Sequence, residues 1–110
     1  MDSASMSQIF FALAEPTRRE IIEMLAKKGR LSATDIYNRF AMSHPAVSQH
    51  LKVLRDTKLV RVEKHAQQRI YRVNSLTFNE LGKWVQNMQQ QWEKRFERLD
   101  ALLQKEKRED

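Results

Sequence analysis

Residues 43–60 read SHPAVSQHLKVLRDTKLV, and the fold is organised around this stretch. Ser43 is of a residue type favoured at helix N-caps, and Pro45 fits the first helical turn, where its missing N–H costs nothing. The apolar residues that follow at helical spacing form one narrow stripe: Val47, Leu51 and Leu54. This pattern predicts a short helix that buries a single edge.

The face opposite the stripe is polar. It carries amide, hydroxyl and cationic side chains beside a proline: Pro45, Ser48, Gln49, Lys52 and Arg55. Such groups hydrogen-bond to base edges and phosphates in the major groove of DNA. We therefore interpret residues 43–56 as a recognition helix.

The composition favours a mostly α fold in a chain of 110 residues, because it holds only two glycines and two prolines. Cysteine is absent, which excludes disulfides, thiolate metal sites and cysteine nucleophiles. The sequence shows no glycine-rich phosphate loop and no His–carboxylate pair at general-base spacing, so we do not expect an enzyme. Without an apolar run of about 20 residues or a signal peptide, a cytoplasmic location with no membrane partner is expected.

The net charge of +6 is confined to one part of the chain. Residues 1–38 carry five basic and five acidic side chains, and residues 73–110 carry seven of each. Residues 39–72 carry eight basic side chains against Asp56 and Glu63. A clustered excess is the electrostatic footprint expected for binding a polyanion, here double-stranded DNA.

Three helices are expected before the recognition helix. An apolar segment covers residues 6–14, Pro16 opens a second helix that Gly29 ends, and Ser32 opens a third that reaches Arg39. Ser32 and Asp35 resemble a capping box. Two short helices separated by the turn 40–42 form a helix-turn-helix unit, whose second helix enters the major groove.

Residues 59–74 change from helical to alternating periodicity and predict a β-hairpin. LVRVEK and RIYRV are the expected strands, with His65–Gln68 between them. A hairpin directly after a helix-turn-helix is a wing. Its basic side chains would lie along the flanking DNA backbone or reach into the minor groove: Lys64, Arg69 and Arg72. Two further DNA contacts are expected beside them, Gln67 and Gln68. The other interpretation of these charges is an ordinary solvated hairpin face.

From Ser75 to about Lys107 the pattern is that of one long helix, roughly 48 Å at ~1.5 Å per residue. Its apolar seam is too long for so small a domain to cover, which favours a homodimer. The expected dimer contacts on the two helices are Ile9, Phe10, Leu13, Trp84, Val85, Met88, Trp92, Phe96 and Leu99. The alternative is a helix folded back on its own domain. We expect a DNA-binding domain at 1–74 and a dimerisation helix with a charged tail at 75–110.

Several stretches together resemble one known family. ALAEPTRREIIEML, LSATDI, SHPAVSQHLKVLRDTKLV and the hairpin ending RIYRV occur in the order and spacing typical of ArsR/SmtB winged-helix repressors. The resemblance covers residues 8–74. The long C-terminal helix with its tryptophans is closer to members that sense no metal and act as autorepressors.

The resemblance implies a homodimeric transcriptional repressor on a pseudo-palindromic operator. It places His44, Pro45, Ser48 and Gln49 against bases, and Lys52 or Arg55 near phosphates. His50 borders the apolar stripe, which leaves two roles open, a packed histidine or a base contact. His44 could read a base or support the helix N-terminus.

The chain departs from the metal-sensing members of this family. They use cysteines on the third helix or His, Asp and Glu sets on the last helix, and this chain has no cysteine and no histidine after His65. We expect no metal site and no cofactor. Three possibilities for release from DNA stay open: a small-molecule effector in the dimer interface, a protein effector, or no signal beyond autorepression.

A second function class competes with the repressor. A winged helix with a long apolar C-terminal helix could also be a protein-interaction or dimerisation module that binds no DNA. Steep salt dependence of duplex binding would separate the two. The sequence thus predicts a mostly α fold with a small β-hairpin, a winged helix-turn-helix followed by a long C-terminal helix.

Overall fold

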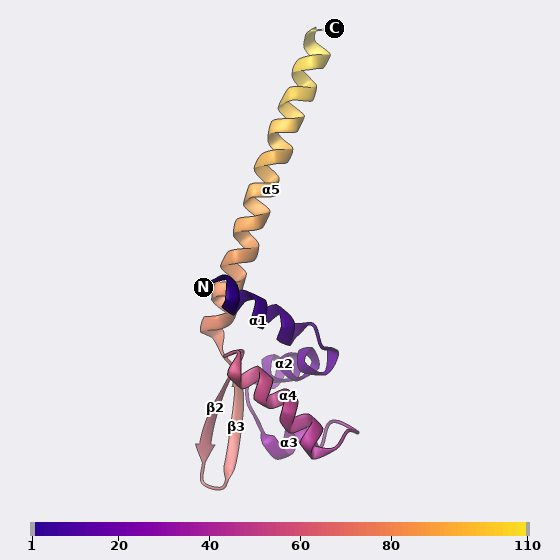
Figure 1. The fold of residues 1–110 in the computed structure, drawn as a ribbon. Coiled ribbons are helices and arrows are strands. Elements are labelled where there is room, and N and C mark those ends of the chain that lie inside the picture. The colour runs from indigo at the N-terminus through magenta and orange to yellow at the C-terminus, as the bar shows by residue number, and fades with distance from the viewer. Residues whose placement is uncertain (1, 110) are drawn as a thin grey trace. The chain divides into compact units, whose positions relative to one another are not determined.

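The computed structural model describes residues 2–109, and its elements follow the expected order (Figure 1). They are α1 (Ser3–Leu13), α2 (Pro16–Lys28), β1 (Leu31–Ser32), α3 (Ala33–Tyr37), α4 (His44–Asp56), β2 (Val60–His65), β3 (Gln68–Val73) and α5 (Ser75–Glu109). The chain forms two compact units, one ending at Phe78 and the other beginning at Asn79. Each unit is described separately below. The mostly α fold with a winged helix-turn-helix is confirmed.

The recognition helix α4 begins as its sequence predicts. The Ser43 hydroxyl accepts a hydrogen bond from the Ala46 backbone N–H at 3.3 Å, and Pro45 lies in the first turn. The predicted stripe of Val47, Leu51 and Leu54 is buried, with no side chain more than 2% exposed. The polar face is consequently held away from the core.

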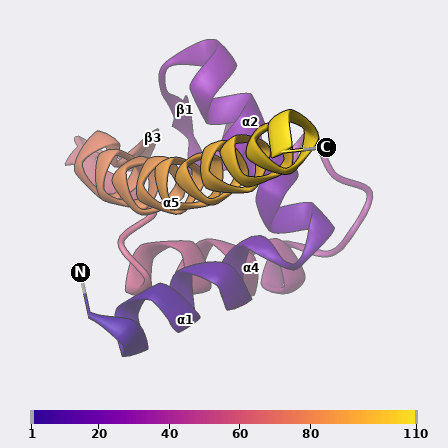
Figure 2. The same ribbon diagram turned by 90° about the horizontal axis from the view of Figure 1, so that it is seen from above.

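The core of the first unit lies between the helices and one face of a three-stranded sheet. α2 contacts α1, α4 and β3, and α4 also contacts β2, so α2 lies at the centre of the packing (Figure 2). The largest fully buried side chains come from four segments, namely α2, α3, α4 and the turn before β2: Ile21, Leu25, Ile36, Val47, Leu51, Leu54 and Leu59. This packing fixes the position of α4 in the unit.

The third helix is shorter than expected. Leu31 and Ser32 form a strand that pairs antiparallel with β3, opposite Tyr71 and Ile70. The Ser32 hydroxyl accepts from the Asp35 N–H at 3.1 Å, so Ser32 is the N-cap as predicted. The expected extension to Arg39 is wrong, since α3 ends at Tyr37. The sequence did not predict β1, because a strand of two residues is too short to leave a periodic pattern.

The hairpin is longer than expected because its loop is only Ala66 and Gln67. His65 and Gln68, predicted to lie in the loop, are paired with each other in the ladder. The sheet order is β1-β3-β2, with every neighbouring pair antiparallel. Ala66 has a φ of 55°, a left-handed conformation that glycine adopts more easily. The chain makes this tight turn without glycine.

The first helix begins earlier than expected, whereas the last helix begins where the sequence predicts. α1 begins at Ser3 rather than Met6, because the Asp2 carboxylate accepts from the Ser5 N–H at 2.7 Å and caps the helix. α5 runs for 35 residues, from Ser75 to Glu109. No helix within residues 2–109 combines the length and the apolar character needed to cross a bilayer.

Candidate nucleic-acid interface

A groove of about 350 Å³ runs between α3, α4 and β3. Its lining residues are Ala33, Tyr37, Pro45, Ser48, Gln49, Lys52, Arg55, Arg69 and Tyr71. Six of the side chains predicted to bind DNA therefore share one concave surface, five from α4 and one from the wing. Three of the nine are cations, and none of these nine described residues is a carboxylate. Such a surface attracts phosphate.

The outward face of α4 is available to a partner. The residues predicted to read bases or contact phosphates are all exposed: His44, Pro45, Ser48, Gln49, Lys52 and Arg55. The buried stripe on the other side of the same helix fixes their direction. A helix held by one edge and polar on the other suits the major groove, which admits an α-helix.

His44 has a partner that the sequence did not indicate. The Tyr37 ring of α3 stacks on the His44 imidazole, with the ring centroids 4.6 Å apart and an interplanar angle of 15°. Tyr37 also lines the groove. The available signal was an aromatic residue at the end of the first helix of the helix-turn-helix. That position alone does not indicate which side chain it meets.

The two faces of the wing differ. Lys64 is paired with Arg69, and Val62 with Tyr71, so these residues share the face that packs toward the core. Arg72 is paired with Arg61 on the opposite face, where its Nη2 lies 3.5 Å from the Glu63 carboxylate. Arg69, but not Arg72, lines the groove with α4.

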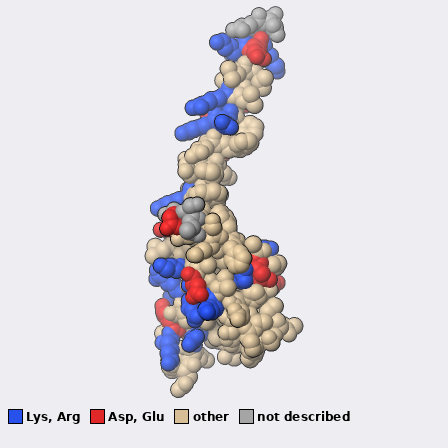
Figure 3. All heavy atoms as spheres, in the orientation of Figure 1, with Lys and Arg blue, Asp and Glu red and all other residues tan. Residues whose placement is uncertain are grey.

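The tip of the wing is polar. Gln67 lies in the turn, and Gln68 pairs with His65 at the end of the ladder. On the outer face the Glu63 carboxylate lies 3.2 Å from His65 Nε2. Lys and Arg side chains gather on the visible surface of the hairpin, with carboxylates among them (Figure 3). The charge excess expected from residues 39–72 is thus visible there as a mixed but mainly basic surface.

His50 lies on the inner side of α4, in agreement with the packed interpretation. Its side chain is 20% exposed, and its Nδ1 is 3.2 Å from Arg18 Nη1 and 3.7 Å from Glu15 Oε2. Burial raises the pKa of Glu15, but hydrogen bonds from the Arg18 and Thr17 backbone N–H groups and the charges of His50 and Arg18 outweigh it. The pKa of Glu15 consequently lies below its ordinary value.

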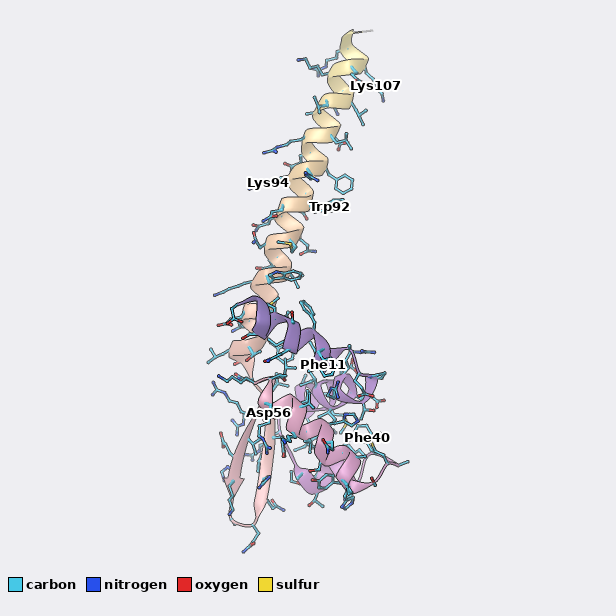
Figure 4. The ribbon with its side chains drawn as sticks, viewed as in Figure 1. Phe11, Phe40, Asp56, Trp92, Lys94 and Lys107 are labelled. Carbon is cyan, nitrogen blue, oxygen red and sulfur yellow. The ribbon has the colours of Figure 1, made fainter. Side chains whose placement is uncertain are left out.

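The expected dimer residues of α1 divide into two groups. Ile9 is 3% exposed and belongs to the core of its own unit, and Leu13 is half-buried. Phe10 and Phe11 are 43% and 69% exposed. α1 therefore presents two aromatic side chains on the surface, and Phe11, which lies outside the predicted dimer set, is the more exposed of the two. Figure 4 labels Phe11 on α1.

The second unit is the part of α5 from Asn79 onward, and its apolar residues are exposed along much of its length. Those between 38% and 62% exposed are Trp84, Val85, Met88, Trp92, Phe96, Leu99, Leu102 and Leu103. Trp92 and Phe96 make an edge-to-face contact with centroids 5.0 Å apart. Among the side chains that the structure describes, His, Asp and Glu nowhere gather in a group of three that could hold a metal ion.

The fold and this surface define a class of protein. A short helix, a turn and a second helix with an exposed polar face, followed by a basic hairpin, make up a winged helix-turn-helix. In agreement, residues 13–63 match the family described as a helix-turn-helix domain.

Comparison with known proteins narrows the class. The chain is 32% identical to the transcriptional repressor SdpR of Bacillus subtilis over 82 residues. The matched region covers 74% of this chain and 90% of SdpR. It is 35% identical over 74 residues to an arsenical resistance operon repressor of Staphylococcus xylosus, covering 67% of this chain and 70% of that one.

Solved structures of similar fold agree with these sequence relatives. An ArsR-like transcriptional regulator from Rhodococcus sp. RHA1 matches with a TM-score of 0.79 at 25% identity, covering 90% of this chain and 92% of that one. The ArsR family transcriptional regulator RHA00566 matches with a TM-score of 0.76 at 27% identity, covering 84% and 95%. The chain belongs to the ArsR/SmtB family of winged helix-turn-helix transcriptional regulators.

Proposed function

We propose that this protein is a homodimeric repressor that binds a pseudo-palindromic DNA operator. The observation that carries the proposal is the groove in which Ser48 and Gln49 of α4 lie beside Lys52, Arg55 and Arg69. Amide and hydroxyl groups supply base contacts, each good bidentate contact giving about 1–3 kcal/mol of discrimination. The cations supply phosphate contacts, from which most of the affinity comes.

The other wing residues that were predicted to bind DNA differ in their position relative to the groove. Lys64 shares the core-side face of the wing with Arg69 and extends the basic surface from the groove. Gln67 and Gln68 lie at the tip, where a wing meets the flanking duplex. Arg72 contributes to the charge of the outer face, where Glu63 partly neutralises it.

Dimerisation is supported by the apolar side chains that both units expose. Large exposed apolar patches are rare on monomers and mark interaction sites. Such exposed side chains occur on α1, at Phe10 and Phe11, and on α5 from Trp84 to Leu103. Two copies would place two recognition helices in successive major grooves, ~34 Å apart. We also propose a cytoplasmic location, since a repressor must reach the chromosome.

Fluorescence anisotropy tests the proposal directly. The protein is titrated with a duplex from its own promoter and with a scrambled duplex of the same length, at about 50 and about 200 mM salt. We expect preference for the promoter duplex and affinity that falls steeply with salt. Equal weak binding to both duplexes would contradict the proposal that an operator lies at the protein's own promoter. Absence of binding at either salt would instead favour the interaction module, for which the exposed α5 residues are the supporting feature.

Analytical ultracentrifugation tests the dimer independently. We expect one species of twice the monomer mass of 13.1 kDa at micromolar concentration. A monomer at that concentration, with promoter binding retained, would leave the DNA-binding part of the proposal and overturn the homodimer.

A further inference from the structure

One buried guanidinium lies where α1, α2 and the recognition helix meet. Arg18 of α2 is only 8% exposed. Its Nε donates to the Ala12 carbonyl at 2.7 Å and its Nη2 to the Phe11 carbonyl at 3.3 Å, both in the last turn of α1. Its Nη1 lies 3.2 Å from Nδ1 of His50 on α4. Three elements therefore depend on one side chain.

The contacts of Arg18 suit its chemistry. The last carbonyls of a helix lack partners within the helix, and the planar fork of arginine can reach several acceptors at once. The guanidinium carbon also lies 5.5 Å from the centre of the Phe11 ring, within range of a cation–π contact. Burying a cation is costly, and these hydrogen bonds offset part of that cost.

We propose that Arg18 is a positioning residue for DNA recognition, acting through His50, with Glu15 as the second partner of that histidine. The proposal rests on the proposed DNA-binding function. His50 directly follows Ser48 and Gln49, which line the groove. Because α4 is a rigid helix, a displacement at His50 carries these two side chains with it. Recognition tolerates only about 0.5 Å of misplacement.

The arrangement makes this positioning depend on the charge of His50. A neutral imidazole with its proton on Nε2 accepts the Arg18 hydrogen bond at Nδ1, whereas both nitrogens of the protonated ring are donors. Protonation therefore breaks the Arg18 contact and places two cations side by side. The Glu15 carboxylate, 3.7 Å from Nδ1, then becomes the favoured partner. The charged groups facing His50 are thus Arg18 and Glu15 of the α1–α2 corner, beside the carbonyls of α1.

Four variants separate positioning from plain stability. His50→Asn keeps an acceptor near the place of Nδ1 but does not titrate, and His50→Leu removes the acceptor. Arg18→Lys keeps the charge but loses the fork. Arg19→Gln is the matched control, because Arg19 is exposed and donates to the Leu13 carbonyl of the same corner at 2.7 Å.

Anisotropy with the promoter duplex gives the first readout. At about pH 7.5, His50→Leu and Arg18→Lys should lose affinity about tenfold, the effect of one hydrogen bond to a charged group, while His50→Asn and Arg19→Gln stay near wild type. Between about pH 7.5 and about pH 5.5, wild type should weaken by a similar factor relative to His50→Asn, because only the imidazole can gain a proton. Both proteins keep His44 and His65, so the ratio isolates the change at position 50. A ratio that stays constant with pH overturns the proposal.

Hydrogen exchange of the free protein gives a readout without DNA. The amides of α4 should lose protection in His50→Leu, and in wild type at about pH 5.5, after correction for intrinsic exchange, but not in His50→Asn. Failure of wild type to bind the promoter duplex at about pH 7.5 would count against the proposed operator alone. Equal α4 protection in wild type and His50→Leu at both pH values would overturn the positioning role of Arg18.

Discussion

The Tyr37 ring lies almost parallel to the His44 imidazole, with the ring centroids 4.6 Å apart. Tyr37 is the last residue of α3 and His44 is the first of α4, so this pair joins the two helices across the turn. His44 is exposed and lies beside the groove that Tyr37 lines. The stacked pair therefore fixes the N-terminus of the recognition helix at the surface where bases would be read.

Removing the Tyr37 ring should weaken DNA binding, because the stacked pair fixes the start of α4. An aromatic pair contributes about 0.5–1.5 kcal/mol beyond its buried area, so Tyr37→Ala should cost about 1 kcal/mol of binding free energy. Tyr37→Phe keeps the stacking and should bind within about twofold of wild type. Anisotropy with the promoter duplex measures both. Equal affinity of Tyr37→Ala and wild type would contradict a role for the stacked pair in binding.

Two arginines of β3 should differ in their effect on DNA binding. Arg69 lines the groove with Lys52 and Arg55, whereas Arg72 lies on the other face beside Glu63. Arg69→Ala should reduce the slope of log K against log salt by about 1, as expected for one lost phosphate contact. Arg72→Ala, the matched control on the same strand, should leave the slope nearly unchanged. If Arg72→Ala reduced the slope more than Arg69→Ala, the face of the wing that carries Arg72 and Glu63 would be the one that contacts DNA.

Two substitutions on α4 should separate stability from recognition. Leu54 has no measurable exposure, so Leu54→Ala should lower the free energy of unfolding by about 2–5 kcal/mol. Gln49 is exposed in the groove, so Gln49→Ala should change stability by less than about 0.5 kcal/mol. It should nevertheless lose about 1–3 kcal/mol of preference for the promoter duplex. Urea unfolding and competition binding measure the two quantities.

The elements that the sequence predicts well are those with local signals. Ser43 and Pro45 mark the start of α4, and the apolar stripe marks its buried side, because caps and helical periodicity depend on residues a few positions apart. The alternation of residues 59–74 likewise predicts the wing. These patterns predict structure well because each depends only on residues that are close together in the sequence.

The features that the sequence does not reveal depend on distant partners. β1 exists only because Leu31 and Ser32 find Tyr71 and Ile70 some forty residues later. The contact between Arg18 and His50 joins residues 32 positions apart, and no periodicity relates them. Alternation predicts that Arg69 and Arg72 lie on opposite faces, but only the packing of the sheet shows which face meets α4.

On α5, Trp92 should contribute more to association than its neighbour Lys94. Trp92 is 59% exposed and contacts Phe96, and the two labelled side chains lie on different sides of the helix (Figure 4). Burying a large apolar side chain is worth about 1.5–3 kcal/mol, and each dimer has two copies. Trp92→Ala should therefore raise the dimer dissociation constant by at least about tenfold in sedimentation equilibrium. Lys94→Ala is the control, and equal effects of the two would contradict an interface on the Trp92 side.

Acid should destabilise the free protein in part through Glu15. Its pKa lies below the ordinary value of 4.5, despite burial, because backbone N–H groups and the charges of His50 and Arg18 favour the carboxylate. A carboxyl group whose pKa is lower in the folded state stabilises the fold above its unfolded pKa. That contribution is lost as the pH falls from about 4.5 through the folded pKa. Glu15→Gln keeps an oxygen to accept from the Arg18 N–H, which the wild type places at 3.0 Å, but it cannot titrate.

The Tm of Glu15→Gln should therefore fall less steeply than that of wild type between about pH 5 and about pH 3. Glu23→Gln provides the matched control, since Glu23 is an exposed residue of α2, the helix that Glu15 caps. Its Tm should follow wild type over the same range. Differential scanning calorimetry at several pH values measures all three proteins. Parallel curves for Glu15→Gln and wild type would mean that the Glu15 carboxylate gains nothing from the α1–α2 corner, because a group with equal pKa values in the folded and unfolded states adds no pH dependence to stability.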